Sequence, residues 1–223
     1  KSINHVGEQL CGDHVDVVEQ GENSQVVVLA DGLGSGVKAS ILSTLTSKII
    51  STMMAEGLSL EDCVSTIAAT LPICSVRGVA YSTFTIVHIV NNETAEIMEF
   101  DNPQVIVLRD GSNYLYHRTE MTIGGKRIYK SIIPLKDNDV FILMSDGCPH
   151  AGLGTQFNFG WKRDEIINFL LPNVGRRKAV RRRGLCFCSR YLRKDHSSSI
   201  DSFNFVSAIL VSAAVSPRSD AIS

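Results

Sequence analysis

The chain has 223 residues, of which 44% are hydrophobic, and a formal net charge of −1, so it can bury one large core in one or two domains. No apolar run reaches the about 18–20 residues needed to span a bilayer, and we expect no secretory signal peptide within these residues. The start at Lys1 rather than Met predicts a fragment or a processed chain. Six cysteines lack the spacing of a disulfide framework, which predicts free thiols in a cytoplasmic protein.

The first elements in chain order are a strand and two helices. An apolar run over 26–30 predicts a strand that ends at Asp31. After a glycine-containing loop, apolar residues recur at intervals of four, which predicts a helix ended by Gly57. The sequence Ser59-Leu-Glu-Asp62 is a capping box that opens a second helix, and Pro72 closes it. The apolar face that we expect the first helix to have is formed by Val37, Ile41, Leu45, Ile49 and Met53.

Between Ala80 and Ser145 the pattern changes to short runs typical of strands, with a hairpin signal at Asn91-Asn92 and another over 109–113. Strands in meander order, with helices in separate blocks, favour an α+β fold over a parallel Rossmann sheet. The expected strands cover 81–90, 94–100, 104–108, 114–117, 126–133 and 140–144.

The C-terminal segment 176–223 differs in charge from the rest of the chain. It carries 10 basic and 3 acidic residues, whereas 1–175 carry 12 and 20. The basic run over 176–183 is of a kind that binds nucleic acid or another acidic surface. No aromatic residue interleaves it, so a stacking platform for single strands is unsupported. We therefore expect no nucleic-acid partner.

Beyond the strands, the pattern predicts a helix over 163–171 and a last strand over 203–211 with Asp201 just before it. We expect two parts: 1–175 as the principal domain, and 176–223 as a segment that nominally completes it. A shift of reading frame near residue 172 would also account for the change in composition.

The stretch from Asp31 to Ala39 reads Asp-Gly-Leu-Gly-Ser-Gly-Val-Lys-Ala and places a carboxylate and three glycines between a strand and a helix. Its second half fits the dinucleotide fingerprint GxGxxA only weakly, because no second strand ending in an acidic residue follows. The P-loop spacing is absent. With both nucleotide-binding motifs excluded, the remaining hypothesis is a site in which the carboxylate binds a cation and the glycines leave room for a phosphate. The alternative is a plain glycine turn without a ligand.

Two further aspartates adjoin glycine. Asp13 lies in Cys11-Gly-Asp13, and Asp146 lies in Ser145-Asp-Gly147, directly after the predicted strand over 140–144. Hard divalent cations such as Mg²⁺ and Mn²⁺ prefer oxygen ligands. Together with Asp31, these residues predict a cation site formed by three carboxylates.

The motifs around these aspartates resemble the stage II sporulation protein E type of metal-dependent protein phosphatase, the bacterial branch of the type 2C serine/threonine phosphatases. The resemblance runs from about residue 7 to about residue 171. It implies a central antiparallel β-sandwich flanked by helices, in α-β-β-α layers. Further matching stretches are Ala80-Tyr-Ser-Thr-Phe-Thr-Ile, Phe100-Asp-Asn-Pro-Gln-Val-Ile-Val-Leu-Arg-Asp-Gly111 and Asp146-Gly-Cys-Pro-His-Ala-Gly152.

The resemblance also implies roles for single residues around two Mn²⁺ or Mg²⁺ ions. Asp13 and Asp146 would each bind a metal, Asp31 would bridge both, and Gly32 would contribute its backbone carbonyl. No catalytic residue beyond these ligands is implied. The family pattern includes a Gly-Asp-Asp before the last strand, whereas this chain has no Asp-Asp after residue 146, which leaves Asp201 as a stand-in.

The function implied is hydrolysis of phosphoserine or phosphothreonine by a metal-activated water. By the same resemblance, the substrate would be a phosphorylated regulatory protein of the anti-anti-sigma kind. The main alternative is a catalytically inactive phosphatase fold that binds a phosphoprotein. Nucleic-acid binding through the basic segment is weaker still, and salt-sensitive retention on DNA would be needed to support it.

Overall fold

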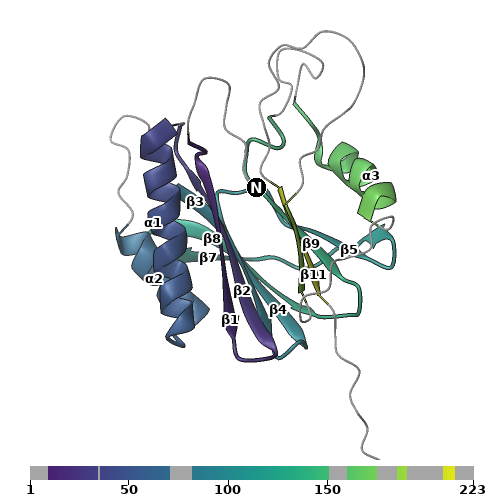
Figure 1. Cartoon of the computed structure of the whole chain (residues 1–223), viewed down its shortest axis with the longest axis horizontal. Helices are drawn as coiled ribbons and strands as arrows, with labels where there is room; N and C mark the ends of the chain where they lie inside the picture. Colours follow the sequence, from purple (N-terminus) through teal and green to yellow (C-terminus); the bar gives the residue numbers. More distant parts are fainter. Residues whose placement is uncertain are drawn as a thin grey trace, which may run out of the picture.

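The computed structural model describes residues 10–34, 36–70, 82–150, 160–174, 185–189 and 208–213. The described elements form four layers (Figure 1): two helices, a six-stranded sheet, a five-stranded sheet and a third helix. This arrangement confirms the α+β fold with a central sandwich flanked by helices. The helices are α1 (Gly36–Ala55), α2 (Leu60–Thr70) and α3 (Arg163–Val174).

Every strand pairing in the two sheets is antiparallel. The six-stranded sheet is formed, in spatial order, by β1 (Asp13–Gln20), β2 (Ser24–Gly32), β3 (Ser82–Val90), β4 (Thr94–Phe100), β8 (Lys126–Pro134) and β7 (Thr119–Ile123). The five-stranded sheet is formed by β10 (Leu185–Ser189), β11 (Ala208–Ala213), β9 (Val140–Met144), β5 (Ile106–Arg109) and β6 (Ser112–Asn113).

Alternation along the strands divides the interior into separate apolar clusters. In β2, Val26 and Val28 face α1 and α2, whereas Val27 and Leu29 face the second sheet. A further cluster lies between the second sheet and α3 and includes Ile167. Because β2 is buried on both faces, its run of apolar residues is continuous rather than alternating.

Local signals fix several element boundaries. The amide of Asp62 donates to Ser59 Oγ over 3.1 Å, which confirms the predicted cap of α2. After α1, Gly57 has a φ of +83° and its amide donates to the Met54 carbonyl, while the next amide reaches Met53. These two bonds are those of a Schellman motif, and they explain why Gly57 ends the helix.

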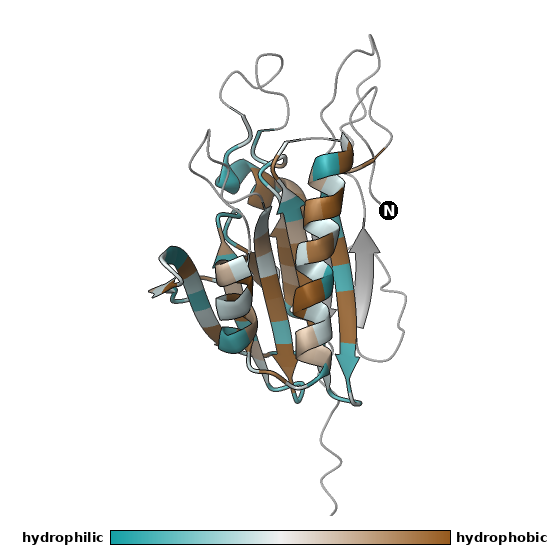
Figure 2. Ribbon diagram, turned by 90° about the vertical axis from the view of Figure 1, so that its left-hand side faces the viewer, coloured by the Kyte–Doolittle hydropathy of each residue, from teal (hydrophilic) through white to brown (hydrophobic). Residues whose placement is uncertain are grey.

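The predicted apolar face of α1 is wrong in its first half, whereas Ile49 and Met53 pack against the core as predicted. Val37, Ile41 and Leu45 are 62%, 59% and 54% exposed, and α1 turns hydrophobic residues toward the viewer in Figure 2. The buried face consists largely of small residues, which let the helix lie close to the sheet. Buried hydroxyls such as that of Ser47 bond to backbone carbonyls of the same helix. The residues buried on α1 are Gly36, Ala39, Ser43, Thr46, Ser47, Ile50, Ser51 and Met54.

Several boundaries also differ from expectation. Residues 114–117 form no strand; instead the amide of Tyr114 donates to the Val107 carbonyl over 2.7 Å. Strands β1, β6, β7 and β10 were not predicted. Strand β11 overlaps the expected last strand, of which 203–207 lie outside the described residues. The predicted roles of Pro72 and Asp201 lie outside the described residues. Within the described part, no helix has the length and apolar character needed to cross a membrane.

Candidate functional site

Two of the predicted site residues lie side by side at one end of the sandwich. In the pairing of β1 with β2, Asp13 is directly opposite Asp31, and just beyond them the Gly32 amide donates to the Gly12 carbonyl over 3.0 Å. Asp31 follows Val27 and Leu29 on the face of β2 that looks toward the second sheet. The register of one hairpin therefore brings together two of the expected metal ligands.

The third aspartate comes from the second sheet. Strand β9 ends at Met144, and the buried Ser145 that follows donates from Oγ to Asp13 Oδ2 over 3.0 Å. Asp146 is exposed and begins a turn in which the His150 amide donates to its carbonyl. Ser145 thus ties the end of β9 to the start of β1, although nothing in the residue pattern indicated this bond.

The electrostatics show that the three carboxylates interact. Burial, and then the nearby carboxylates of Asp13 and Asp146, raise the pKa of Asp31 to about 9. The physical cause is that a partly desolvated group next to two further acids resists becoming a third negative charge. Burial and crowding therefore oppose the ionisation of Asp31 in the cation-free protein.

Gly32 is fixed by the approach of α1. A Cβ at this position would lie 2.0 Å from the carbonyl oxygen of Ala39, so any side chain would clash with the helix backbone. Gly34 has a φ of +92°, which also favours glycine. These glycines allow the chain to turn from the end of β2 directly into the N-terminus of α1.

A second set of polar residues surrounds Asp31 from the side of β3. The buried Ser82 donates from Oγ to the Asp31 carbonyl over 3.0 Å, and Thr83 is opposite Asp31 in the β2–β3 pairing. Thr83 in turn donates to Asn102 Oδ1 over 2.6 Å. Thr83 and Asn102 lie in stretches that match the family pattern, but nothing in their spacing indicated that they form a hydrogen bond.

His14 does not join the site. His14 follows Asp13 but points to the opposite face of β1, where its Nδ1 lies 3.4 Å from Thr44 Oγ1 on α1. Cys11, Cys63 and Cys148 are in the thiol form, as predicted. Burial raises the pKa of Cys63 to about 11 and that of Cys148 to about 12. Neither buried thiol is a ready nucleophile.

The donors at this end of the sandwich fit a hard divalent cation. All three side chains offer carboxylate oxygens, which such cations prefer, and a cation would replace the proton that crowding holds on Asp31. No three His, Cys, Asp or Glu side chains in the described part of the chain form a ready-made ligand set. Asp31 interacts with the carboxylate of Asp13 and with that of Asp146.

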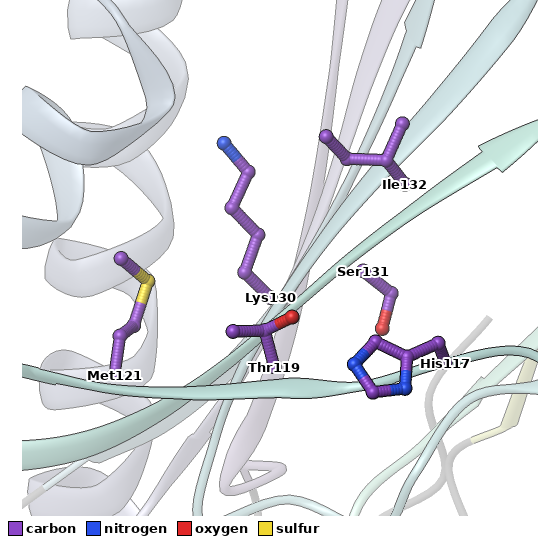
Figure 3. A pocket seen from close by; sticks show the side chains of 6 residues that line it. All are labelled: His117, Thr119, Met121, Lys130, Ser131 and Ile132. Atoms are coloured by element: carbon purple, nitrogen blue, oxygen red, sulfur yellow. The ribbon is translucent and has the colours of Figure 1, made fainter.

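The cavity in Figure 3 is remote from the aspartates. It has a volume of about 350 Å³ and lies along β7 and β8, at the opposite edge of the six-stranded sheet from β1. Its lining residues are His117, Thr119, Met121, Lys130, Ser131 and Ile132. Lys130 also forms an ion pair with Glu61 on α2, so its charge is already compensated.

The sequence model of the family called stage II sporulation protein E (SpoIIE) matches residues 21–168. The chain belongs to the SpoIIE family. No curated protein sequence matches the chain, so the remaining likenesses are structural.

The structure of this SpoIIE-family chain is similar to several solved phosphatase structures. The PP2C phosphatase domain of SpoIIE from Bacillus subtilis, solved with a fragment of its regulatory domain, has a TM-score of 0.65 at 17% identity and covers 96% of this chain and 60% of that one. The RsbU and RsbW domains of a Mycobacterium tuberculosis protein have a TM-score of 0.66 at 13% identity, covering 93% and 56%. RsbX in complex with magnesium has a TM-score of 0.56 at 16% identity, covering 95% and 92%.

These likenesses establish the PP2C phosphatase fold. The chain spans 60% and 56% of the first two matched chains. At family level, SpoIIE proteins with this fold are phosphatases, and the RsbX structure contains a divalent metal.

Proposed function

We propose that this chain is a divalent-cation-dependent serine/threonine phosphoprotein phosphatase. The observation that carries the proposal is the meeting of Asp13, Asp31 and Asp146, from three separate segments, at one end of the sandwich. The membership of the SpoIIE family supports the same activity.

The proposed ligands of two Mn²⁺ or Mg²⁺ ions are Asp13, Asp31, Asp146 and the backbone carbonyl of Gly32, with Asp31 shared between the ions. When bound, such ions supply an acidified water and neutralise phosphoryl oxygens. The chain's own part is to hold and orient these groups. Ser145 fixes one oxygen of Asp13, and Asp31 gives up its proton as the cation binds.

The substrate phosphate has space next to this cluster. Gly34 presents no side chain, with nothing within 4 Å of where its Cβ would lie. The N-terminus of α1 begins two residues further along and has unsatisfied amides that favour an anion. We propose no protein nucleophile, because the buried thiols of the described residues have raised pKa values.

The proposed substrate is a phosphorylated regulatory protein, and the proposed location of the chain is the cytoplasm. The similar structures that support this include the RsbU and RsbW domains of a Mycobacterium tuberculosis protein and a structure described with the bacterial stressosome. We also propose that 176–223 completes the domain of 1–175. Support comes from β11, which pairs with β9 in the second sheet.

The alternative function is a phosphatase fold that binds a phosphoprotein without hydrolysing it. The absence of an Asp-Asp after residue 146 favours this alternative, since two divalent ions would then face only three aspartates. The stand-in Asp201 lies outside the described residues.

One experiment separates the two functions. Binding of Mn²⁺ and then of a phosphoserine peptide is measured by titration calorimetry, and phosphate release from the same peptide is followed in parallel samples. The phosphatase proposal predicts Mn²⁺-dependent release that is abolished in Asp31→Asn and retained in the control Asp110→Asn, an exposed residue paired with Lys136. Peptide binding without release supports the alternative, and neither binding nor release refutes both.

A further inference from the structure

A chain of three polar side chains leads from the interior of the six-stranded sheet to Asp31. It consists of Thr85, Asn102 and Thr83, and it belongs to β3 and the loop after β4. The inference drawn from it rests on the proposed function, because it concerns the water that a phosphatase must position.

Asp31 lies between two directly opposed neighbours. Asp13 is opposite it on β1, and Thr83 is opposite it on β3. Directly opposed residues on one face of an antiparallel sheet have Cβ atoms about 4.5–5.5 Å apart. The Thr83 hydroxyl is therefore placed on the side of Asp31 away from Asp13, within reach of one water molecule.

The direction of the hydrogen bonds determines what Thr83 can offer. Asn102 Nδ2 donates to Oγ1 of the fully buried Thr85 over 3.1 Å, which turns its Oδ1 toward Thr83. Thr83 Oγ1 then donates its only proton to that Oδ1 over 2.6 Å. With its proton used, the Thr83 hydroxyl retains only lone pairs for any further partner.

The loop that carries Asn102 is itself fixed. Asp101 has a φ of +51°, and three residues after Asn102 the Val105 amide donates to Oε1 of the buried Glu99 over 2.6 Å. Arg163 on α3 donates to the Gln104 and Val105 carbonyls. The backbone around Asn102 is thus fixed by these hydrogen bonds. The side-chain amide of Asn102 therefore determines the orientation of the Thr83 hydroxyl, and not the reverse.

A hydroxyl that can only accept is poorly suited to a carboxylate or a phosphoryl oxygen, both of which are acceptors. It suits a donor, and a water in the shell of a divalent cation is a strong donor. We infer that Thr83, oriented by Asn102, accepts a hydrogen bond from a water in the coordination shell of the cation at Asp31. Thr83 is then a positioning residue for the hydrolytic water.

The test uses Mn²⁺ bound to the full chain and the exchange rate of its coordinated water, measured by ¹⁷O NMR relaxation. Thr83→Val keeps the shape but removes the acceptor, so we expect exchange about fivefold faster, the size of one ordinary hydrogen bond. Thr83→Ser keeps the hydroxyl and should match the parent. Thr94→Val, at the far end of the same sheet, is the control and should leave the rate unchanged.

Asn102→Ala tests the same role independently, because it removes the oxygen to which the Thr83 hydroxyl donates. It should reproduce the faster exchange of Thr83→Val, and the double variant should add nothing further, because both act through one acceptor. Where turnover is measurable, kcat should fall in both single variants while KM stays constant.

The outcomes separate this inference from the proposed function. Unchanged water exchange in Thr83→Val, with Mn²⁺ bound, overturns the role of Thr83 and leaves the phosphatase proposal intact. Additive effects of the two variants overturn the orienting role of Asn102. A parent chain that binds no Mn²⁺ overturns both the metal site and the inference.

Discussion

Replacing Asp31 with asparagine should relieve an electrostatic cost in the cation-free protein, although it removes the central ligand of the proposed site. The pKa of Asp31 is raised to about 9 by burial and by Asp13 and Asp146. Between pH 4 and pH 9, in round figures, the unfolded chain releases this proton while the folded chain retains it. Stability is therefore full at low pH and falls as pH rises through this window.

The magnitude has an upper limit of about 1.4 kcal/mol for each pH unit, or about 4 kcal/mol between pH 5 and pH 8. Asp31 is only partly buried and lies next to two further carboxylates, so we expect about 1–2 kcal/mol over that range. Asparagine has no proton to lose. The stability of Asp31→Asn relative to the parent should therefore increase by this amount from pH 5 to pH 8.

The assay is urea unfolding, followed by circular dichroism in the presence of a chelator, at pH 5, 6.5 and 8. Asp110→Asn serves as the control, because Asp110 is exposed and paired with Lys136. A stability difference between Asp31→Asn and the parent that stays constant with pH, or that moves in the opposite direction, refutes the reasoning. Saturating Mn²⁺ should stabilise the parent but not Asp31→Asn.

Two further predictions concern packing. Gly32→Ala should lower the unfolding free energy by about 3 kcal/mol or more, because its Cβ would overlap the Ala39 carbonyl. The control Gly12→Ala, whose Cβ meets atoms no nearer than 3.4 Å, should lower it far less. Equal urea midpoints of the two variants would contradict this prediction. Ile50→Ala should cost about 2–4 kcal/mol, whereas Ile41→Ala on the exposed face of α1 should cost about 0.5 kcal/mol or less. A larger loss for Ile41 in thermal or urea unfolding would restore the face predicted from sequence.

The sequence predicted the β3–β4 hairpin because alternation and turn residues are local signals. The tight turn at Asn91-Asn92, where both residues have positive φ, is one example. The meander order was wrong beyond this hairpin, because β4 pairs with β8 while β5 pairs with β9 in the other sheet. The face of α1 could not be predicted in the same way. Burial of its serines depends on hydroxyls bonding within the helix and on close approach to Gly32, neither of which a hydrophobic period reports.

The candidate site also contains residues that could be predicted from local sequence and residues that could not. Asp13, Asp31 and Asp146 each stand next to glycine at the edge of an element, so the residue pattern was enough to select them. Ser145 and Thr83 were not selected, because their roles arise only from the registers that bring β1, β2, β3 and the end of β9 together. The frame-shift hypothesis for 176–223 stays a prediction, to be tested on the coding DNA.

The position of β11 has a consequence for biosynthesis. Strand β9, which leads into the Asp146 turn, lies between β5 and β11. During translation, β9 therefore leaves the ribosome with one edge unpaired and stays so until residues 208–213 have been made. A nascent chain stalled earlier presents an apolar strand, Val140–Met144, as a template for neighbouring chains. The C-terminal segment 176–223, which contains β11, thus protects the newly made protein from aggregation.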